Sequence, residues 1–426
     1  MTDTDADADA GSDPAEGVRV ELRTWLEANW DPELALIDWR TRLVEAGWAC
    51  PGLPSRWGGR DLPASQVEVV AEELARAGAP GVADGVGMHL AVPTLLEHAD
   101  DALAERLVRP TITGQLTWCQ LFSEPGAGSD LAGLTTRAER DGDTWIVRGQ
   151  KVWNTSAHHA DLGLLLARTD WGVPKHRGIT CFALPMHQPA VDVRPLRQMN
   201  GHASFNEVFL DAAEVPADHV IGPVGGGWAV ALTTLAHERR LAPGRAGVPR
   251  PDRPGRAVRE AQAEQAVAAA PYVWYPQRAG RPDLVVSQAQ AGGVDQDPVV
   301  RQAVARVVTL SRVAQWTQRR ALAARALGRP PGPEGSLGKL ASSHIARASA
   351  EAHARITGAS AMLRGADSPL DGVIAEILVS VPAVSIAGGT DEIQRNILAE
   401  RILGLPREPD DARTRPFDQV PHNGLP

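Results

Sequence analysis

The sequence predicts a mainly helical α+β fold with a helical segment, a β-rich segment and a second helical segment in that order. The apolar residues have helical spacing from residue 20 to about 118. Between 119 and about 222 the pattern changes to short β-like runs separated by Gly and Pro. Helical spacing then returns from residue 227 onward. Because 426 residues are too many for one ordinary domain, we expect two or three domains packed into a common unit.

The clearest pattern of the first helical segment lies at 65–74. Val67, Val70 and Leu74 fall on one face of a helix there. Ser65 and Glu68 have the spacing of a capping box, so the helix is expected to begin at this point. The segment therefore predicts an amphipathic helix in an N-terminal helical domain.

Short strands are expected in the middle segment. Their ranges are 144–147, 162–167, 179–184 and 206–210. Runs of this length between turn residues are typical of a small antiparallel sheet domain.

Helices are expected again in the last segment. Their ranges are 228–240, 299–327, 336–363 and 390–403. The stretch 241–297 fits this pattern poorly, because it contains closely spaced prolines and glycines that break a long helix. We favour a solvated insertion loop here, and a functional lid or partner site is the alternative.

The composition excludes several classes of protein. No apolar run is long enough to cross a bilayer, so no membrane role is expected. The net charge of -9 disfavours nucleic-acid binding. The cysteines Cys50, Cys119 and Cys181 are odd in number and have no CxxC spacing, which argues against disulfides or a zinc site and favours the cytoplasm. The acidic start, 1–17, is expected to be a disordered tail rather than a signal peptide.

Three ordered blocks carry the residues of chemical interest. They are 122–130 (FSEPGAGSD), 149–155 (GQKVWNT) and 388–395 (GGTDEIQR). In sequence, order and separation they resemble the flavin-binding signatures of the acyl-CoA dehydrogenase family. The resemblance covers about 20–407 and implies a central antiparallel β-domain between two helical domains, the last a four-helix bundle that forms the oligomer interface.

The expected boundaries are a disordered acidic tail at 1–17, an N-terminal helical domain at 18–118, a β-domain for flavin and substrate contacts at 119–222, a C-terminal helical bundle at 223–408 with the insertion at 241–297, and a tail at 409–426.

The resemblance implies that Glu238 is the general base. Most relatives carry the base in a Tyr-Glu-Gly-Thr turn, where this chain has Ala387-Gly388-Gly389-Thr390 and no carboxylate. The isovaleryl and long-chain branches instead place a glutamate in a Glu-Arg pair on an earlier helix, and Glu238-Arg239 falls on that position. Arg239 is then expected to contact the substrate. The alternative is a surface glutamate paired with a neighbouring arginine, as most such pairs are.

The implied reaction is the α,β-dehydrogenation of an acyl thioester to the trans-2-enoyl thioester. A carboxylate must take the α proton in a dry pocket, where burial raises its pKa. Donors must hold the thioester oxygen, and the backbone N–H of Gly388 is the implied donor together with a flavin hydroxyl. The hydride from Cβ goes to flavin N5. Thr390 is predicted to cap a helix whose first turn carries Asp391 and Glu392.

The resemblance implies FAD as the cofactor. Phe122 and Ser123 would line the isoalloxazine ring, Ser129 would touch both flavin and substrate, and Trp153 with Thr155 would cover the other face. The full set of predicted flavin contacts is Phe122, Ser123, Gly128, Ser129, Trp153, Asn154, Thr155, Gly389, Thr390 and Glu392.

Other residues near these blocks have simpler interpretations. Trp153 at a strand end could equally pack in a core. For Lys151 and Asn154 a framework role is favoured over catalysis. The adjacent His158 and His159 are expected to point in opposite directions on an extended segment, and we assign no metal to them.

The resemblance also implies partners and leaves alternatives open. The electron acceptor would be an electron-transfer flavoprotein, and the assembly a homotetramer, with a heterotetramer possible because 241–297 lacks the family's Arg-x-x-Phe-Gly element. The acyl group and its carrier, CoA or an acyl carrier protein, stay open. One alternative function is a flavin-dependent oxidase or N-hydroxylating monooxygenase that uses O₂. Another is a non-catalytic subunit of a heterotetrameric dehydrogenase.

Overall fold

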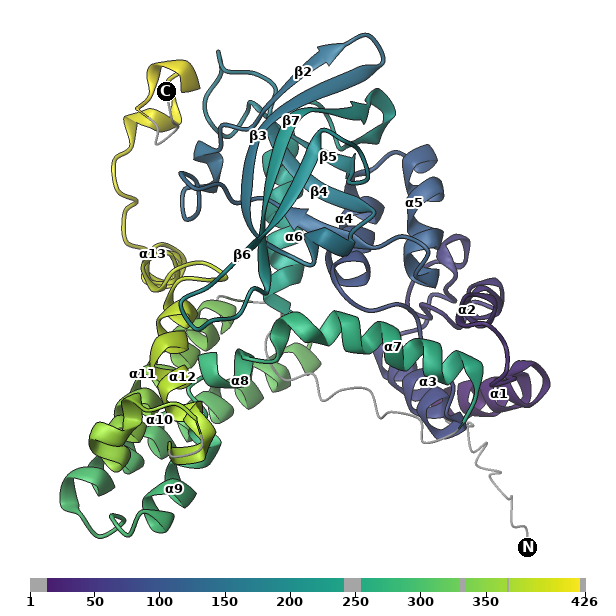
Figure 1. The fold of residues 1–426 in the computed structure, drawn as a ribbon. Coiled ribbons are helices and arrows are strands. Elements are labelled where there is room, and N and C mark those ends of the chain that lie inside the picture. The colour runs from purple at the N-terminus through teal and green to yellow at the C-terminus, as the bar shows by residue number, and fades with distance from the viewer. Residues whose placement is uncertain (1–13, 241–253, 330–331, 333, 366–367, 422–426) are drawn as a thin grey trace, which may run out of the picture.

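A computed structural model describes residues 14–240, 254–329, 332, 334–365 and 368–421. The predicted order of helices, sheet and helices is confirmed. Figure 1 shows the sheet with the N-terminal helices on one side and the C-terminal helices on the other, and α7 running between the two helical groups. Across these described ranges, no helix combines the length and apolar character that a bilayer crossing needs.

The N-terminal domain has five α-helices, α1 (Pro14–Asn29), α2 (Leu36–Glu45), α3 (Ala64–Ala77), α4 (Val92–His98) and α5 (Asp101–Thr113). The predicted capping box is wrong, because α3 begins one residue earlier and Ser65 lies inside its first turn. Glu73 on α3 is almost fully buried and pairs with Arg19 and Arg23 of α1 at 2.6 and 2.8 Å. This pairing fixes α1 against α3.

The middle domain is an eight-stranded sheet in the order β6-β7-β3-β2-β4-β5-β8, with β1 beside β4. Its strands are β1 (Trp118–Leu121), β2 (Arg137–Asp141), β3 (Thr144–Thr155), β4 (Leu162–Arg168), β5 (Ile179–Pro185), β6 (Val191–Leu196), β7 (Phe205–Pro216) and β8 (Val220–Ile221). The expected antiparallel pairing holds for most of it, but β1 and β2 both pair with β4 in parallel. The sheet is therefore mixed.

Strand β4 divides the interior into two cores. Its residues alternate, so that Leu164 and Leu166 join the core shared with the N-terminal helices, while Leu165 and Ala167 join the core on the opposite face. Both faces of the strand are buried. An unbroken apolar run is what such a position requires.

The C-terminal part contains α6 (Gly227–Arg240), α7 (Arg256–Ala269), α8 (Tyr275–Arg278), α9 (Val285–Ala291), α10 (Pro298–Ala326), α11 (Glu334–Thr357), α12 (Val373–Ser380) and α13 (Asp391–Arg401). Helices α10, α12 and α13 all pack against α11. The long α10 matches its predicted range closely, whereas α11 ends at Thr357 and a 3-10 turn occupies most of the rest of the predicted 336–363.

The solvated insertion loop expected at 241–297 is wrong for the part that the structure describes, which starts at 254. Residues 256–269 are mostly Ala, Gln, Glu and Val, and they form α7. Ala257, Trp274 and Val285 are buried. Glu264 on α7 also binds Arg40 of α2 at 2.6 Å. The proline-rich residues 241–253 lie outside the described residues.

Part of the C-terminal tail docks on the β-domain. The backbone N–H of Phe417 donates to the carbonyl oxygen of Val173 at 2.9 Å. The Phe417 ring is buried, and the guanidinium of Arg168 lies 3.5 Å from its centroid. Figure 1 shows the C-terminal end beside the sheet rather than beside the helices that precede it.

Candidate active site

The loop that follows β1 carries the first block of predicted flavin contacts. A tight turn joins Glu124 and Ala127 through mutual backbone hydrogen bonds of 3.0 and 3.1 Å. Phe122 is buried and Ser123 half-buried, whereas Gly128 and Ser129 are exposed. The loop thus presents backbone amides and the Ser129 hydroxyl at the surface, which suits contact with a phosphate-bearing ligand.

A buried ion pair holds this loop against β3. The Lys151 ammonium lies 2.8 Å from a Glu124 oxygen, and both side chains are almost fully buried. The Glu124 carboxylate also accepts bonds from the backbone N–H groups of Thr135 and Thr136 at 2.7 and 2.9 Å. Burial alone would raise the pKa of Glu124, but the Lys151 charge and these donors hold that pKa at about 2. Sequence reasoning missed Glu124, because nothing local shows that it is buried.

The end of β3 displays Trp153 toward solvent. A register shift between Lys151 and Asn154 interrupts the pairing with β7. Trp153 lies in this shift with φ of 65° and its ring 57% exposed. Core packing is therefore not its role in this chain. A large ring held open at a bulge is available to stack on a ligand.

Asn154 connects β3 to β1. Its side-chain N–H donates to the backbone carbonyl oxygen of Gln120 at 2.7 Å. Its backbone carbonyl oxygen accepts a bond from the Asn206 side chain at 2.8 Å. The Asn154 Oδ1 atom is buried and has no hydrogen-bond partner among the described residues. Such an orphan acceptor indicates a missing donor at this site.

Glu238 lies near the end of α6, and Gln120 joins it to β3. The Gln120 side chain donates to Glu238 at 3.4 Å, while the Gln120 backbone holds Asn154 as described. Helix α6 reaches this place because Gly227 packs on the backbone of β5, where an added Cβ would lie 2.7 to 2.8 Å from Thr180 and Cys181. The structure thus places the half-buried Glu238 near the end of β3.

The predicted Arg239 contact is not assessed by the structure. Its backbone belongs to α6, but its side chain lies outside the described residues.

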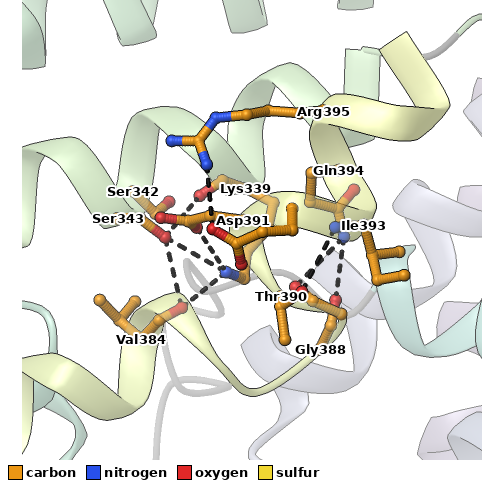
Figure 2. A network of polar contacts seen from close by, with 12 residues as sticks. Lys339, Ser342, Ser343, Val384, Gly388, Thr390, Asp391, Ile393, Gln394 and Arg395 are labelled. Atoms are coloured by element: carbon orange, nitrogen blue, oxygen red, sulfur yellow. Dashed lines mark hydrogen bonds and ion pairs between the residues drawn. The ribbon is translucent and has the colours of Figure 1, made fainter. Parts of the chain in front are cut away.

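The turn that carries Gly388 is fixed on α11 (Figure 2). Gly388 and Gly389 have φ of 69° and 85°. Thr390 caps α13, because its side chain accepts from the backbone N–H of Ile393 at 3.3 Å, which confirms the predicted cap. Gln394 donates to the Gly388 carbonyl oxygen at 3.2 Å, which holds the turn against the first turns of α13.

Asp391 holds this turn against α11. Its buried carboxylate lies 3.1 Å from Arg347 and 3.6 Å from Lys339, both on α11. Lys339 also donates to the Val384 carbonyl oxygen at 2.6 Å, as Figure 2 shows. Burial alone would raise the pKa of Asp391, but the bond from Ser343 and the Lys339 charge lower it. Glu392 is exposed and pairs with Arg395 at 3.1 Å.

Two tyrosines that sequence reasoning missed are within electrostatic reach of Glu238. Tyr272 ends the short turn after α7, and Tyr275 begins α8. Burial raises the pKa of the Tyr272 hydroxyl, the Glu238 charge adds to this rise, and the Thr155 side chain partly offsets it. Their omission has a plain cause, since 241–297 was interpreted as a solvated loop.

The expected geometry of the histidine pair is wrong. His158 and His159 lie in a short 3-10 turn, and their ring centroids are only 3.9 Å apart. Within the residues that the structure covers, no group of three or more His, Cys, Asp or Glu side chains could hold a metal ion.

The arrangement fits a flavin. Trp153 has an exposed ring. The loop after β1, at residues 126–130, has exposed backbone amides and the Ser129 hydroxyl. Asn154 has a buried acceptor without a donor among the described residues. A ring system linked to a nucleotide needs an aromatic surface to stack on, backbone amides to bind its phosphates and a polar atom to accept a hydrogen bond from the ring.

Three family models match this chain. They are the acyl-CoA dehydrogenase N-terminal domain at residues 16–115, the middle domain at 119–213 and the C-terminal domain at 285–403. Glu238 and the two tyrosines lie between the second and third matched ranges.

Related proteins are similar over most of the chain. Acyl-CoA dehydrogenase IpdE1 of Mycobacterium tuberculosis is 34% identical over 419 residues, which cover 92% of this chain and 98% of that protein. Acyl-CoA dehydrogenase FadE34 of the same organism is 35% identical over 366 residues, 86% of this chain and 46% of FadE34.

Two solved structures have the same fold. The ChsE4-ChsE5 complex of M. tuberculosis superimposes with a TM-score of 0.62 at 25% identity over 94% of this chain and 100% of the matched chain. A variant of the Tcur3481-Tcur3483 steroid ACAD gives the same TM-score and identity over 92% of this chain and 99% of the other.

Proposed function

Since this chain belongs to the acyl-CoA dehydrogenase family, we propose that it converts an acyl thioester to the trans-2-enoyl thioester with Glu238 as the general base. The family consists of FAD-dependent oxidoreductases of lipid metabolism that act on CH–CH bonds, and acyl-CoA dehydrogenase activity follows from membership.

The observation that carries the proposal is the position of Glu238. Its carboxylate is half-buried, accepts a bond from the Gln120 side chain at 3.4 Å, and is joined through Gln120 to Asn154 at the end of β3. A general base needs a partly desolvated carboxylate within reach of the reacting carbon. Glu238 meets the first requirement and borders the residues expected to face the flavin, which supports the second.

The other residues would bind and orient. Trp153 and Thr155 would cover the flavin, and the 126–130 turn would hold its phosphates together with Ser129. The Gly388 N–H would hold the thioester oxygen, where negative charge grows as Glu238 removes the α proton. Arg239 would contact the substrate. Bound FAD supplies the acceptor for the hydride that leaves Cβ.

The expected partners also stay proposals. We propose an electron-transfer flavoprotein as the acceptor of the electrons. A homotetramer is our first expectation for the assembly, and the two-component solved relatives support a heterotetramer as the alternative. The three cysteines are unpaired, which is consistent with the cytoplasm as the proposed compartment.

Anaerobic titration of the yellow protein tests the function. Short, branched, long and steroid-like acyl-CoAs are added in turn, the last because one solved relative is named a steroid ACAD, and bleaching of the flavin absorbance is followed. One class should bleach the wild-type flavin, and Glu238→Gln should retain FAD but stay oxidised. Glu97→Gln is the matched control, because Glu97 also contacts α6, accepting from Thr233 at 3.0 Å, but its side chain is 56% exposed and has no predicted role in the reaction.

Two results would redirect the proposal. If no thioester bleaches a fully loaded flavin, the dehydrogenase reaction is wrong for this chain alone. Rapid H₂O₂ formation in air would then indicate an oxidase or monooxygenase. Activity that appears only with a second, different chain would indicate the non-catalytic subunit of a heterotetramer.

A further inference from the structure

The only two tyrosines of this 426-residue chain are within electrostatic reach of the proposed base. Tyr272 ends a short 3-10 turn after α7, and Tyr275 begins α8. Glu238 itself is joined through Gln120 to Asn154 at the end of β3. The contacts of the tyrosines lead to the same end of β3.

These tyrosines belong to a continuous array of aromatic rings. Trp153, Phe205, Trp274, Tyr275 and Tyr272 follow one another with centroid separations of 5.7, 6.3, 5.1 and 4.8 Å, each pair edge to face. Edge-to-face contacts of this kind fix ring orientation. The array is thus a rigid surface between the end of β3 and the end of α6.

Trp274, in the middle of the array, is the residue that packs in the interior. Trp274 is 2% exposed, and its ring N–H donates to the Ser204 hydroxyl at 3.1 Å. Tyr272 and Val273, in contrast, are 41% and 60% exposed. Because Trp274 already anchors the segment, its exposed neighbours are free to contact a ligand, and an apolar surface beside an acidic group is typical of a binding site.

We infer that Tyr272 and Tyr275, with Val273, form an apolar wall of the acyl-binding site and discriminate between acyl groups by their bulk close to the thioester. The inference rests on the proposed function, because it is Glu238 acting at Cα that brings the nearest acyl carbons to this wall. A rigid aromatic wall cannot yield to an extra methyl group, whereas a flexible aliphatic one can. Tyr272 is therefore a specificity-determining residue.

The low tyrosine count gives a direct binding test. Holoprotein labelled with 3-fluorotyrosine should show two ¹⁹F resonances, which Tyr272→Phe and Tyr275→Phe assign. The 2-enoyl-CoA product of the best substrate is the probe, since it binds without turnover, and CoA alone is the control. The enoyl-CoA should shift the Tyr272 resonance, and CoA should not.

Kinetics then tests discrimination. The best substrate from the titration is compared with its analogue that differs by one methyl branch at Cβ. Tyr272→Ala should change the ratio of their kcat/KM values by about tenfold or more, the range seen when a pocket gains or loses a methylene-sized space. Tyr272→Phe keeps the ring and should leave the ratio nearly unchanged.

The outcomes separate the two ideas. If acyl-CoAs bleach the flavin but neither ¹⁹F resonance moves with enoyl-CoA, the wall is wrong and the function stands. An unchanged selectivity ratio in a folded, FAD-loaded Tyr272→Ala protein contradicts it equally. Should no thioester bleach the flavin, the function fails and the wall fails with it. The ¹⁹F measurement with enoyl-CoA is made on the protein with its two tyrosines in place, so the inference can be tested even if Tyr272→Ala folds poorly.

Discussion

Replacement of Lys151 by Met should destabilise the protein by about 3 kcal/mol and should do so less at acidic pH. Lys151 and Glu124 form a buried pair at 2.8 Å, and removal of one partner leaves the other charged in the interior. Breaking a buried pair in this way typically costs about 3 to 5 kcal/mol. A pKa held at about 2 instead of 4.5 for Glu124 corresponds to about 3 kcal/mol, which agrees with the lower end.

The pH dependence distinguishes this cause from lost packing. In the wild type the Glu124 pKa is lowered, so the stability it contributes is present above 4.5 and is lost as the pH falls toward 2. Without the Lys151 charge, burial raises the Glu124 pKa, and the carboxyl takes a proton as the pH falls through that raised value. The neutral acid then tolerates burial, so the difference between variant and wild type should shrink from pH 7 to pH 5.

Urea unfolding at both pH values, followed by far-ultraviolet circular dichroism, measures the effect. Lys175→Met is the matched control, because Lys175 pairs with Asp130 of the same loop at 3.0 Å, but the Asp130 side chain is 62% exposed. Water can solvate the Asp130 carboxylate once Lys175 is removed, so the loss should be about 1 kcal/mol or less. Equal losses in the two variants, or a Lys151→Met deficit that does not change with pH, would refute the reasoning.

Three further predictions concern the Gly388 turn and the docked tail. Gly389→Ala should lower the melting temperature more than Gly388→Ala, because both have positive φ but only at Gly389 would a Cβ meet Gln394, at 2.6 Å; equal melting temperatures would contradict this. Thr390→Ala should cost about 1 kcal/mol in chemical unfolding through loss of the α13 cap, and Thr390→Ser should restore most of it, so an unaffected Ala variant would disprove the capping role. Phe417→Ala should release the tail and expose it to limited proteolysis, because the buried ring lies against Arg168; an unchanged cleavage pattern would show that other contacts hold the tail.

The spacing of apolar residues was sufficient to predict an element that is long or fully buried. Helix α10 and the strands β4 and β5 each begin and end within one residue of their predicted ranges, because their apolar spacing repeats over several turns or forms an unbroken run. The short α8, α9 and α12 were missed, since elements of four to eight residues hold too few repeats and are stabilised by tertiary contacts.

The site was only partly predictable for the same physical reason. The Thr390 cap is local and was correctly expected. The Glu124–Lys151 pair and the contact of Gln120 with Glu238 join residues far apart in the chain, and the tertiary fold rather than local sequence decides them. The tyrosines were missed because the prolines of 241–253 led us to interpret the whole stretch 241–297 as a loop, although helix-forming residues follow them.

The reductive half-reaction of three proteins tests the central claim most directly. Wild type, Glu238→Gln and the double variant Glu238→Gln/Gly388→Glu are mixed anaerobically with the best acyl-CoA in a stopped-flow instrument. Glu238→Gln should slow flavin reduction by about 10² to 10⁴, the contribution of a general base. The double variant should recover part of the rate, because a side chain at Gly388 has open space within 4 Å, although its φ of 69° strains the backbone. Flavin reduction by Glu238→Gln at close to the wild-type rate would contradict the account.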